Sequence, residues 1–179
     1  MTDRKTSENQ GEKTYFPLGI DVNGLQCLVV GGGRIGTRKA VTLAQNGGAV
    51  TVLAPEITGQ LRKAVDKGLL RWEKGEYNGS LPDNISLVVA AADDPELNMR
   101  IAEECEKATV LACSVSPGRA ARVIFPAVHR HQGIVVGVHS NGRNCRKSKQ
   151  IRDRIAAVFE ESTTERSSFG LVGVKRDRL

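Results

Sequence analysis

The sequence predicts an α/β protein in which a doubly wound parallel sheet is followed by a small α+β region. Apolar runs such as Leu25–Val30 alternate with helical segments from residue 25 to about 115, which is the pattern of repeated strand–helix units. Beyond residue 116 two apolar runs follow each other with only a short basic link, as in a hairpin. The 179 residues, 40% hydrophobic and 26% charged, are enough for one core and an additional region.

The expected strands are near-continuous apolar runs, which is typical of a parallel sheet covered on both faces. They cover Leu25–Val30, Ala49–Ala54, Leu70–Lys74, Ser86–Ala91 and Thr109–Ser114. Helices are expected over Thr37–Gln45 and Ile57–Lys67. A third opens at Asp93-Asp94-Pro95, where carboxylates and an early proline favour a helix start.

The region after residue 116 is expected to contain a hairpin and a last helix. Its strands cover 122–127 and 133–138, and the helix covers Ser148–Glu161, with apolar residues spaced by four. The predicted division is a disordered leader (1–14), a sheet domain (15–115), a second region (116–161) and a tail that we leave unassigned (162–179).

Composition argues against several classes of function. No apolar run is long enough to span a bilayer, and the polar residues 2–10 predict no secretory signal, so we expect a cytoplasmic protein with no membrane partner. Aromatic residues are 4% and no helix-turn-helix is recognisable, so no nucleic-acid partner is expected. The four cysteines lack a metal-ligand spacing; we expect reduced thiols, buried except for Cys145, and no metal site. The net charge of +6 either indicates an anionic ligand or has no specific functional meaning.

A glycine motif, Gly31-x-Gly33-x-x-Gly36, stands between the first expected strand and the first expected helix. In such a motif the first glycine permits a tight turn, the second lets the backbone approach a pyrophosphate, and the third lets the helix pack on the strand. The phosphates lie at the helix N-terminus, where free N–H groups and the helix dipole favour negative charge. The context of strand, loop and helix predicts a Rossmann-like domain that binds a dinucleotide.

The usual ribose ligand is absent from the second expected strand. Rossmann-like domains have Asp or Glu at its tip, but Ala54-Pro55 stands here, and Glu56 is two positions late. Arg34 in the glycine loop can approach a phosphate, which keeps NADP open beside NAD.

Several segments resemble the precorrin-2 dehydrogenase family, which is also the first module of siroheme synthase. The resemblance covers about residues 15 to 160. Its matching segments are Tyr15-Phe16-Pro17-Leu18, Val29–Ala40, Thr51–Ile57, Ala92-Asp93-Asp94 with Asn98, Arg119-Ala120-Ala121 and Ile124–Ala127. The combination of Gly-Gly-Gly, Arg-Lys-Ala and Ala-Pro-Glu is more specific than the glycine motif alone.

The resemblance implies NAD-dependent dehydrogenation of precorrin-2 to sirohydrochlorin, a step of siroheme biosynthesis, by a homodimer whose contact is made by the second region. It also implies that the cofactor is NAD and that a non-acidic residue at the tip of the second strand is tolerated. The residues expected to line the cofactor are Gly31, Gly33, Arg34, Ile35, Gly36, Ala54, Pro55 and Glu56. Some family members also insert ferrous iron or cobalt.

Ser116 is where the sequence departs from the family's pattern. Members with both activities have an aspartate at this position, to which proton and metal chemistry is assigned. A serine hydroxyl is neither a carboxylate ligand for a divalent metal nor an effective base without an activating partner. We therefore expect dehydrogenation without metal insertion. Ser116 is the candidate catalytic residue, with a plain structural serine as the alternative.

Arginines after the fifth expected strand are candidate substrate ligands, because the implied tetrapyrrole substrate has many carboxylates and arginine pairs with them bidentately. They are Arg119, Arg122 and Arg143. Two alternatives stay open. One is a dehydrogenase of the same fold acting on another anionic substrate, and the other is a nucleotide-sensing regulatory module, which usually keeps an acid where Ala54 stands.

Overall fold

The structure, a computed structural model, describes residues 14–116 and 121–168, with side chains up to residue 160. The chain divides into two compact units, Met1–Ile124 and Phe125–Leu179. The first unit contains the parallel sheet and the second contains a hairpin with a long helix.

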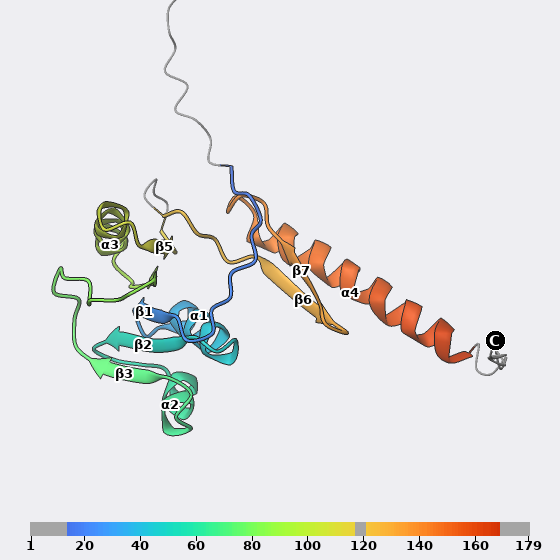
Figure 1. Cartoon of the computed structure of the whole chain (residues 1–179), viewed down its shortest axis with the longest axis horizontal. Coiled ribbons are helices and arrows are strands. Elements are labelled where there is room, and N and C mark those ends of the chain that lie inside the picture. Colours follow the sequence, from blue (N-terminus) through green and yellow to red (C-terminus); the bar gives the residue numbers. More distant parts are fainter. Residues whose placement is uncertain (1–13, 117–120, 169–179) are drawn as a thin grey trace, which may run out of the picture. The chain divides into compact units, whose positions relative to one another are not determined.

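A five-stranded parallel sheet forms the centre of the first unit, in the order β3-β2-β1-β4-β5 (Figure 1). Its strands are β1 (Gln26–Val30), β2 (Ala49–Ala54), β3 (Arg71–Lys74), β4 (Leu87–Ala90) and β5 (Leu111–Ser114). The chain leaves β1 towards one edge of the sheet and leaves β4 towards the other. Ligands of such sheets bind where the strand order reverses, which here is beyond the carboxyl ends of β1 and β4.

Helices cover both faces of this sheet, so the expected doubly wound α/β fold is confirmed. Helices α1 (Arg34–Gln45) and α2 (Gly59–Asp66) lie on one face, and α3 (Pro95–Lys107) lies on the other (Figure 1). A core cluster joins β1, β4 and β5 to α3. Its buried members are Leu28, Val30, Val88, Ala90, Ile101, Cys105 and Ala112.

The helix starts differ in how they are capped. Thr58 accepts the Leu61 N–H at 3.1 Å and begins α2, and Asp94 accepts the Glu96 N–H at 2.8 Å and begins α3 before Pro95. By contrast α1 begins at Arg34, earlier than the expected Thr37, and it has no side-chain cap and no acidic residue in its first turn. The N–H groups at the start of α1 are therefore left for another acceptor.

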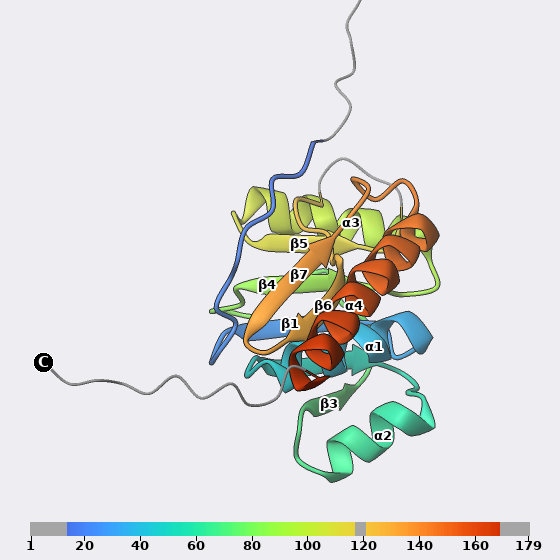
Figure 2. The same cartoon turned by 90° about the vertical axis from the view of Figure 1, so that its right-hand side faces the viewer.

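The second unit is a two-stranded antiparallel sheet with α4 (Cys145–Ser168) lying along one face (Figure 2). The hairpin strands are β6 (Ala127–His131) and β7 (Ile134–Val138). The expected strand at 122–127 was wrong. The two-residue loop Gln132-Gly133 has φ of 47° and 81°, as in a type I′ turn, and this tight turn places β6 directly before it.

The last helix begins at Cys145, before the expected Ser148, and continues past the expected Glu161 to Ser168. Its start is explained by Asn144, whose side-chain oxygen accepts the Lys147 N–H at 2.8 Å. None of the helices in the described part of the chain is both long enough and apolar enough to cross a membrane.

Candidate functional site

The glycine loop after β1 is held by close backbone packing. Gly31 has a φ of 109°, and a Cβ on it would lie 2.2 Å from the Ala91 carbonyl oxygen. A Cβ on Gly36 would lie 2.1 Å from the Gly31 carbonyl oxygen. Only glycine permits these approaches, so the first and third glycines fix the turn and the seat of α1, as the motif predicts.

Gly33 differs from these two because its Cα faces open space. The nearest heavy atom to a Cβ on Gly33 would be Asp93 Oδ1, at 4.0 Å, and its φ of −70° suits any residue. Among the residues that the structure describes, no protein acceptor receives the N–H groups of Gly33, Arg34, Ile35 or Gly36. An open backbone position beside free N–H groups at a helix start fits the pyrophosphate of a dinucleotide.

Two threonines hold the loop from behind. The Gly32 carbonyl accepts from the Thr58 N–H at 3.2 Å and from the Thr37 hydroxyl at 3.3 Å, and the two threonine hydroxyls are 2.8 Å apart. Thr37 is 1% exposed. Sequence reasoning did not identify this pair. The only signal was that one threonine follows Gly36 directly and the other precedes α2.

The tip of β2 offers backbone rather than a carboxylate. Ala54 is 2% exposed, and its carbonyl accepts from Trp72 Nε1 at 2.9 Å and from the Gly75 N–H at 3.3 Å. Pro55 and Glu56 are exposed. The Glu56 carbonyl packs on the loop, because a Cβ on Gly32 would lie 2.2 Å from it. The strand tip and the glycine loop thus form one continuous backbone surface.

The end of β4 is tied to the segment after β5 through Asn98. This side chain is 1% exposed, and its amide both accepts from the Ala92 N–H at 2.9 Å and donates to the Ala92 carbonyl at 2.8 Å. The same Nδ2 donates to Ser116 Oγ at 3.0 Å. A Cβ on Gly31 would lie 2.7 Å from Ala92 N, so this link borders the glycine loop. Ser116 is therefore held at the carboxyl edge of the sheet.

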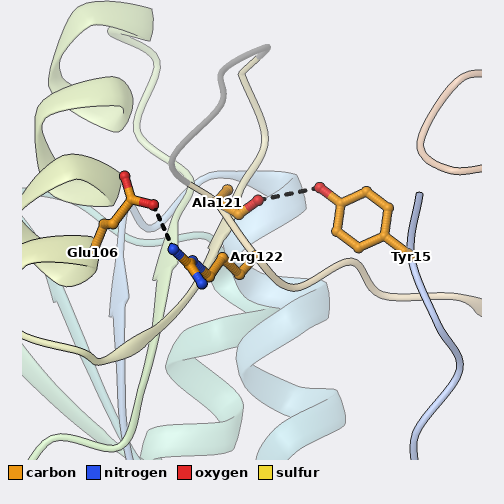
Figure 3. Close-up of polar contacts among 4 residues, drawn as sticks. All are labelled: Tyr15, Glu106, Ala121 and Arg122. Carbon is orange, nitrogen blue, oxygen red and sulfur yellow. Dashed lines mark hydrogen bonds and ion pairs between the residues drawn. The ribbon is translucent and has the colours of Figure 1, made fainter. Parts of the chain in front are cut away.

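The structure describes two of the three candidate substrate arginines. Arg122 donates to Glu106 at the end of α3 at 2.8 Å, and the two side chains are 71% and 43% exposed (Figure 3). Arg143 lies in the second unit, before α4, and Arg119 lies outside the described residues. Beside Arg122, the Ala121 carbonyl accepts from the Tyr15 hydroxyl at 3.1 Å (Figure 3). Burial raises the pKa of Tyr15, with a smaller effect of Cys113 in the same direction.

Cysteine and histidine side chains are the residue types most able to bind a transition metal. All four cysteines are free thiols, buried except for Cys145, as expected. His129 and His131 of β6 stack against Phe159 of α4, with ring centroids 5.7 and 5.1 Å from the phenyl ring. Within the described parts of the chain, no three His, Cys, Asp or Glu side chains gather closely enough to hold a metal ion.

Comparison with known proteins agrees with this site. The family model described as putative NAD(P)-binding matches residues 18–127, a stretch that contains the glycine loop, the tip of β2 and Asn98. A solved structure titled SirC, precorrin-2 dehydrogenase, superposes with a TM-score of 0.69, covering 89% of this chain and 83% of that one. At 22% sequence identity, this likeness concerns the fold.

Curated relatives include siroheme synthases. The chain is 32% identical to that of Photorhabdus laumondii subsp. laumondii over 83% of its own length and 32% of the relative's. It is 34% identical to that of Pseudomonas entomophila over 92% of its own length and 35% of the relative's. The chain thus spans about a third of the length of the curated relatives it matches. It belongs to the putative NAD(P)-binding family.

Proposed function

We propose that the chain catalyses the NAD-dependent dehydrogenation of precorrin-2 to sirohydrochlorin. The observation that carries this proposal is the glycine loop, in which an open Gly33 and the uncapped start of α1 stand next to the tip of β2. The names of the relatives, siroheme synthase and precorrin-2 dehydrogenase, support the choice of substrate.

In this proposal the backbone of the chain binds the cofactor. The N–H groups from Gly33 to Gly36 bind the pyrophosphate, and the surface formed by Ala54, Pro55 and Glu56 receives the adenosine side. Arg34 and Ile35 are exposed in the first turn of α1 and flank the phosphates. Because the described residues at the tip of β2 include an exposed carboxylate, Glu56, which would repel a ribose phosphate, we propose NAD rather than NADP.

In this proposal the nicotinamide and the substrate meet over the carboxyl ends of β4 and β5. When bound, the nicotinamide supplies the hydride acceptor, and the substrate loses one hydride to it and one proton to solvent or to a protein base. Asn98 and Ser116 place a hydroxyl group at this edge. Arg119, Arg122 and Arg143 are proposed to pair with substrate carboxylates. For Arg122 this means exchanging its exposed partner Glu106 for a carboxylate of the substrate.

The test is a turnover assay with purified protein, precorrin-2 and NAD, in which NADH absorbance and the sirohydrochlorin spectrum are followed together. Both signals should rise in equal amounts. A protein that binds NAD but produces neither would contradict the dehydrogenase and favour a nucleotide-sensing module. In a second arm cobalt is added to sirohydrochlorin. Rapid metal insertion would contradict the expectation drawn from Ser116.

We also propose a homodimer formed through the second unit. A two-stranded sheet with one helix buries little apolar surface, and side chains on both layers stay exposed, among them Ile134 at 53%, Val135 at 54% and Val158 at 61%. Sedimentation should give a dimer for the wild-type protein and a monomer for Val158→Asp. Leu69→Asp, which changes an exposed apolar residue of the first unit, is the control and should stay dimeric. A monomeric wild-type protein would refute the assembly.

A cytoplasmic location is proposed as well. Its support is that Cys27, Cys105, Cys113 and Cys145 are all free thiols, which suits a reducing compartment.

A further inference from the structure

The orientation of the Asn98 amide is fixed by its partners. The Ala92 N–H needs an acceptor and the Ala92 carbonyl needs a donor, and Asn98 supplies Oδ1 to the first at 2.9 Å and Nδ2 to the second at 2.8 Å. A flipped amide would face both groups with the wrong atom. The Nδ2 group therefore points its second hydrogen at Ser116 Oγ, at 3.0 Å.

This contact determines what the serine hydroxyl can do. A hydroxyl has one hydrogen and two acceptor lone pairs, and at Ser116 one lone pair is occupied by the Asn98 N–H. The hydroxyl hydrogen must then point away from Asn98. The backbone of Ser116 is also fixed, because its N–H donates to Ser114 Oγ at 3.1 Å and its carbonyl accepts from the same hydroxyl at 3.1 Å.

We propose that Asn98 is a positioning residue that turns Ser116 into a hydrogen-bond donor towards an oxygen of the bound substrate, a carboxylate or carbonyl oxygen. This inference rests on the proposed function. It assigns Ser116 the role of a hydrogen-bond donor instead of a base. The Asn98 amide donates a hydrogen bond to the hydroxyl oxygen and cannot take up the hydroxyl proton, as an activating partner would. The same buried amide also holds both the Ala92 backbone, beside the glycine loop, and the Ser116 hydroxyl.

The experiment is a double-mutant cycle on turnover of precorrin-2 with NAD. Asn98→Asp keeps the acceptor for the Ala92 N–H but puts a carboxylate oxygen where Nδ2 was. The variant therefore loses the bond to the Ala92 carbonyl, and the Ser116 hydroxyl turns to donate to the carboxylate. We expect kcat to fall about ten- to hundred-fold, the size of one hydrogen bond to a charged group. The loss should shrink only in part as the pH falls, because a protonated Asp has one hydrogen for the two acceptors, the Ala92 carbonyl and Ser116 Oγ, that Nδ2 served. The wild-type kcat should not show this pH dependence.

The inference requires the two changes to be non-additive. Ser116→Ala should lose about as much kcat as Asn98→Asp, and the double variant should lose little more. The matched control is Glu104→Gln, on the same helix as Asn98, which alters the contact with the Tyr77 hydroxyl and should leave kcat unchanged. Losses that multiply, or full activity of Ser116→Ala, would overturn the inference while wild-type turnover still supported the proposed function. Absence of wild-type turnover would overturn both.

A second measurement covers the case in which Asn98→Asp does not fold. In ¹⁵N-labelled protein the side-chain amide signals of Asn98 should move in Ser116→Ala and stay in place in Ser116→Thr, which keeps the hydroxyl acceptor. Ser116→Thr should also keep more activity than Ser116→Ala. Equal signals in the two variants, or equal activity losses, would mean that the hydroxyl is not the partner and would refute the inference.

Discussion

Gly33→Ala should separate cofactor binding from folding. The new Cβ would meet no protein atom closer than 4.0 Å, and the φ of −70° is comfortable for alanine. Replacing glycine by alanine at such a position usually stabilises a protein by about 0.4–1 kcal/mol, because the unfolded chain loses freedom. The methyl group instead occupies the space proposed for the pyrophosphate. Losing one hydrogen bond to a charged group, about 1.5–3 kcal/mol, raises the Kd for NAD about ten- to hundred-fold.

Gly36→Ala is the matched counterpart, three positions along the same loop. Its Cβ would lie 2.1 Å from the Gly31 carbonyl oxygen, whereas a carbon and an oxygen normally stay about 3.3 Å or more apart. The loop or the start of α1 must therefore shift by about 1 Å. Overpacking of this kind costs about 1–3 kcal/mol of folding free energy. We expect Gly36→Ala to lower the free energy of unfolding and to weaken NAD binding as well.

Both variants can be measured with one probe. Trp72 is the only tryptophan, and its Nε1 donates to the Ala54 carbonyl at the tip of β2, so its fluorescence should report both NADH binding and unfolding in urea. The decisive result is a split in which Gly33→Ala changes affinity alone and Gly36→Ala changes both quantities. Wild-type affinity in Gly33→Ala would refute the placement of the pyrophosphate. Wild-type stability in Gly36→Ala would refute the packing argument.

Three further substitutions test contacts elsewhere in the first unit. Thr37→Val removes a buried donor to the Gly32 carbonyl, and urea unfolding should reveal a loss of about 1–3 kcal/mol; Thr37→Ser, which keeps the hydroxyl, should restore most of it. Burial raises the pKa of Cys105 from 9.0 to about 11, so the thiol ionises at lower pH in the unfolded chain than in the folded one. The free energy of unfolding should therefore fall as the pH rises from 9 to 11, and Cys105→Ala should flatten that dependence. Glu106→Gln breaks an exposed ion pair and should cost under about 1 kcal/mol, while the freed Arg122 should lower KM for precorrin-2; an unchanged KM would count against this arginine as a substrate ligand.

The sequence was sufficient for the first unit because its signals are local and agree with one another. The run that became β1 is apolar from Cys27 to Val30, the glycines follow it, and Asp94 with Pro95 marks the start of α3. Each of these features depends on neighbours in the chain. The positions of Gly31 and Gly36 were predictable for the same reason, since one turn and one helix seat determine them.

Long-range polar contacts could not be predicted in this way. Thr37 and Thr58 are 21 positions apart, and Asn98 and Ser116 are 18 apart, so no local pattern pairs them. The first strand of the hairpin was misplaced for a different reason. His129 looked like part of a polar link, but in β6 its ring stacks on Phe159, so packing against α4 outweighed its polarity.

Ser116→Asp tests whether the cofactor half of the site, at the glycine loop and the tip of β2, is independent of the reacting half at the ends of β4 and β5. Asn98 Nδ2 donates to Ser116 Oγ at 3.0 Å, and a donor suits a carboxylate oxygen at least as well as a hydroxyl, so the variant should fold and keep its affinity for NAD. The carboxylate adds an oxygen ligand for a divalent metal at the reacting edge. We expect cobalt insertion into sirohydrochlorin to rise above that of the wild-type protein, while Ser116→Asn, of equal size but neutral, should not raise it. If NAD affinity falls in both variants, the cofactor half depends on Ser116 and the two halves are not separable; if neither variant gains insertion, the side chain at this position does not decide between the two chemistries.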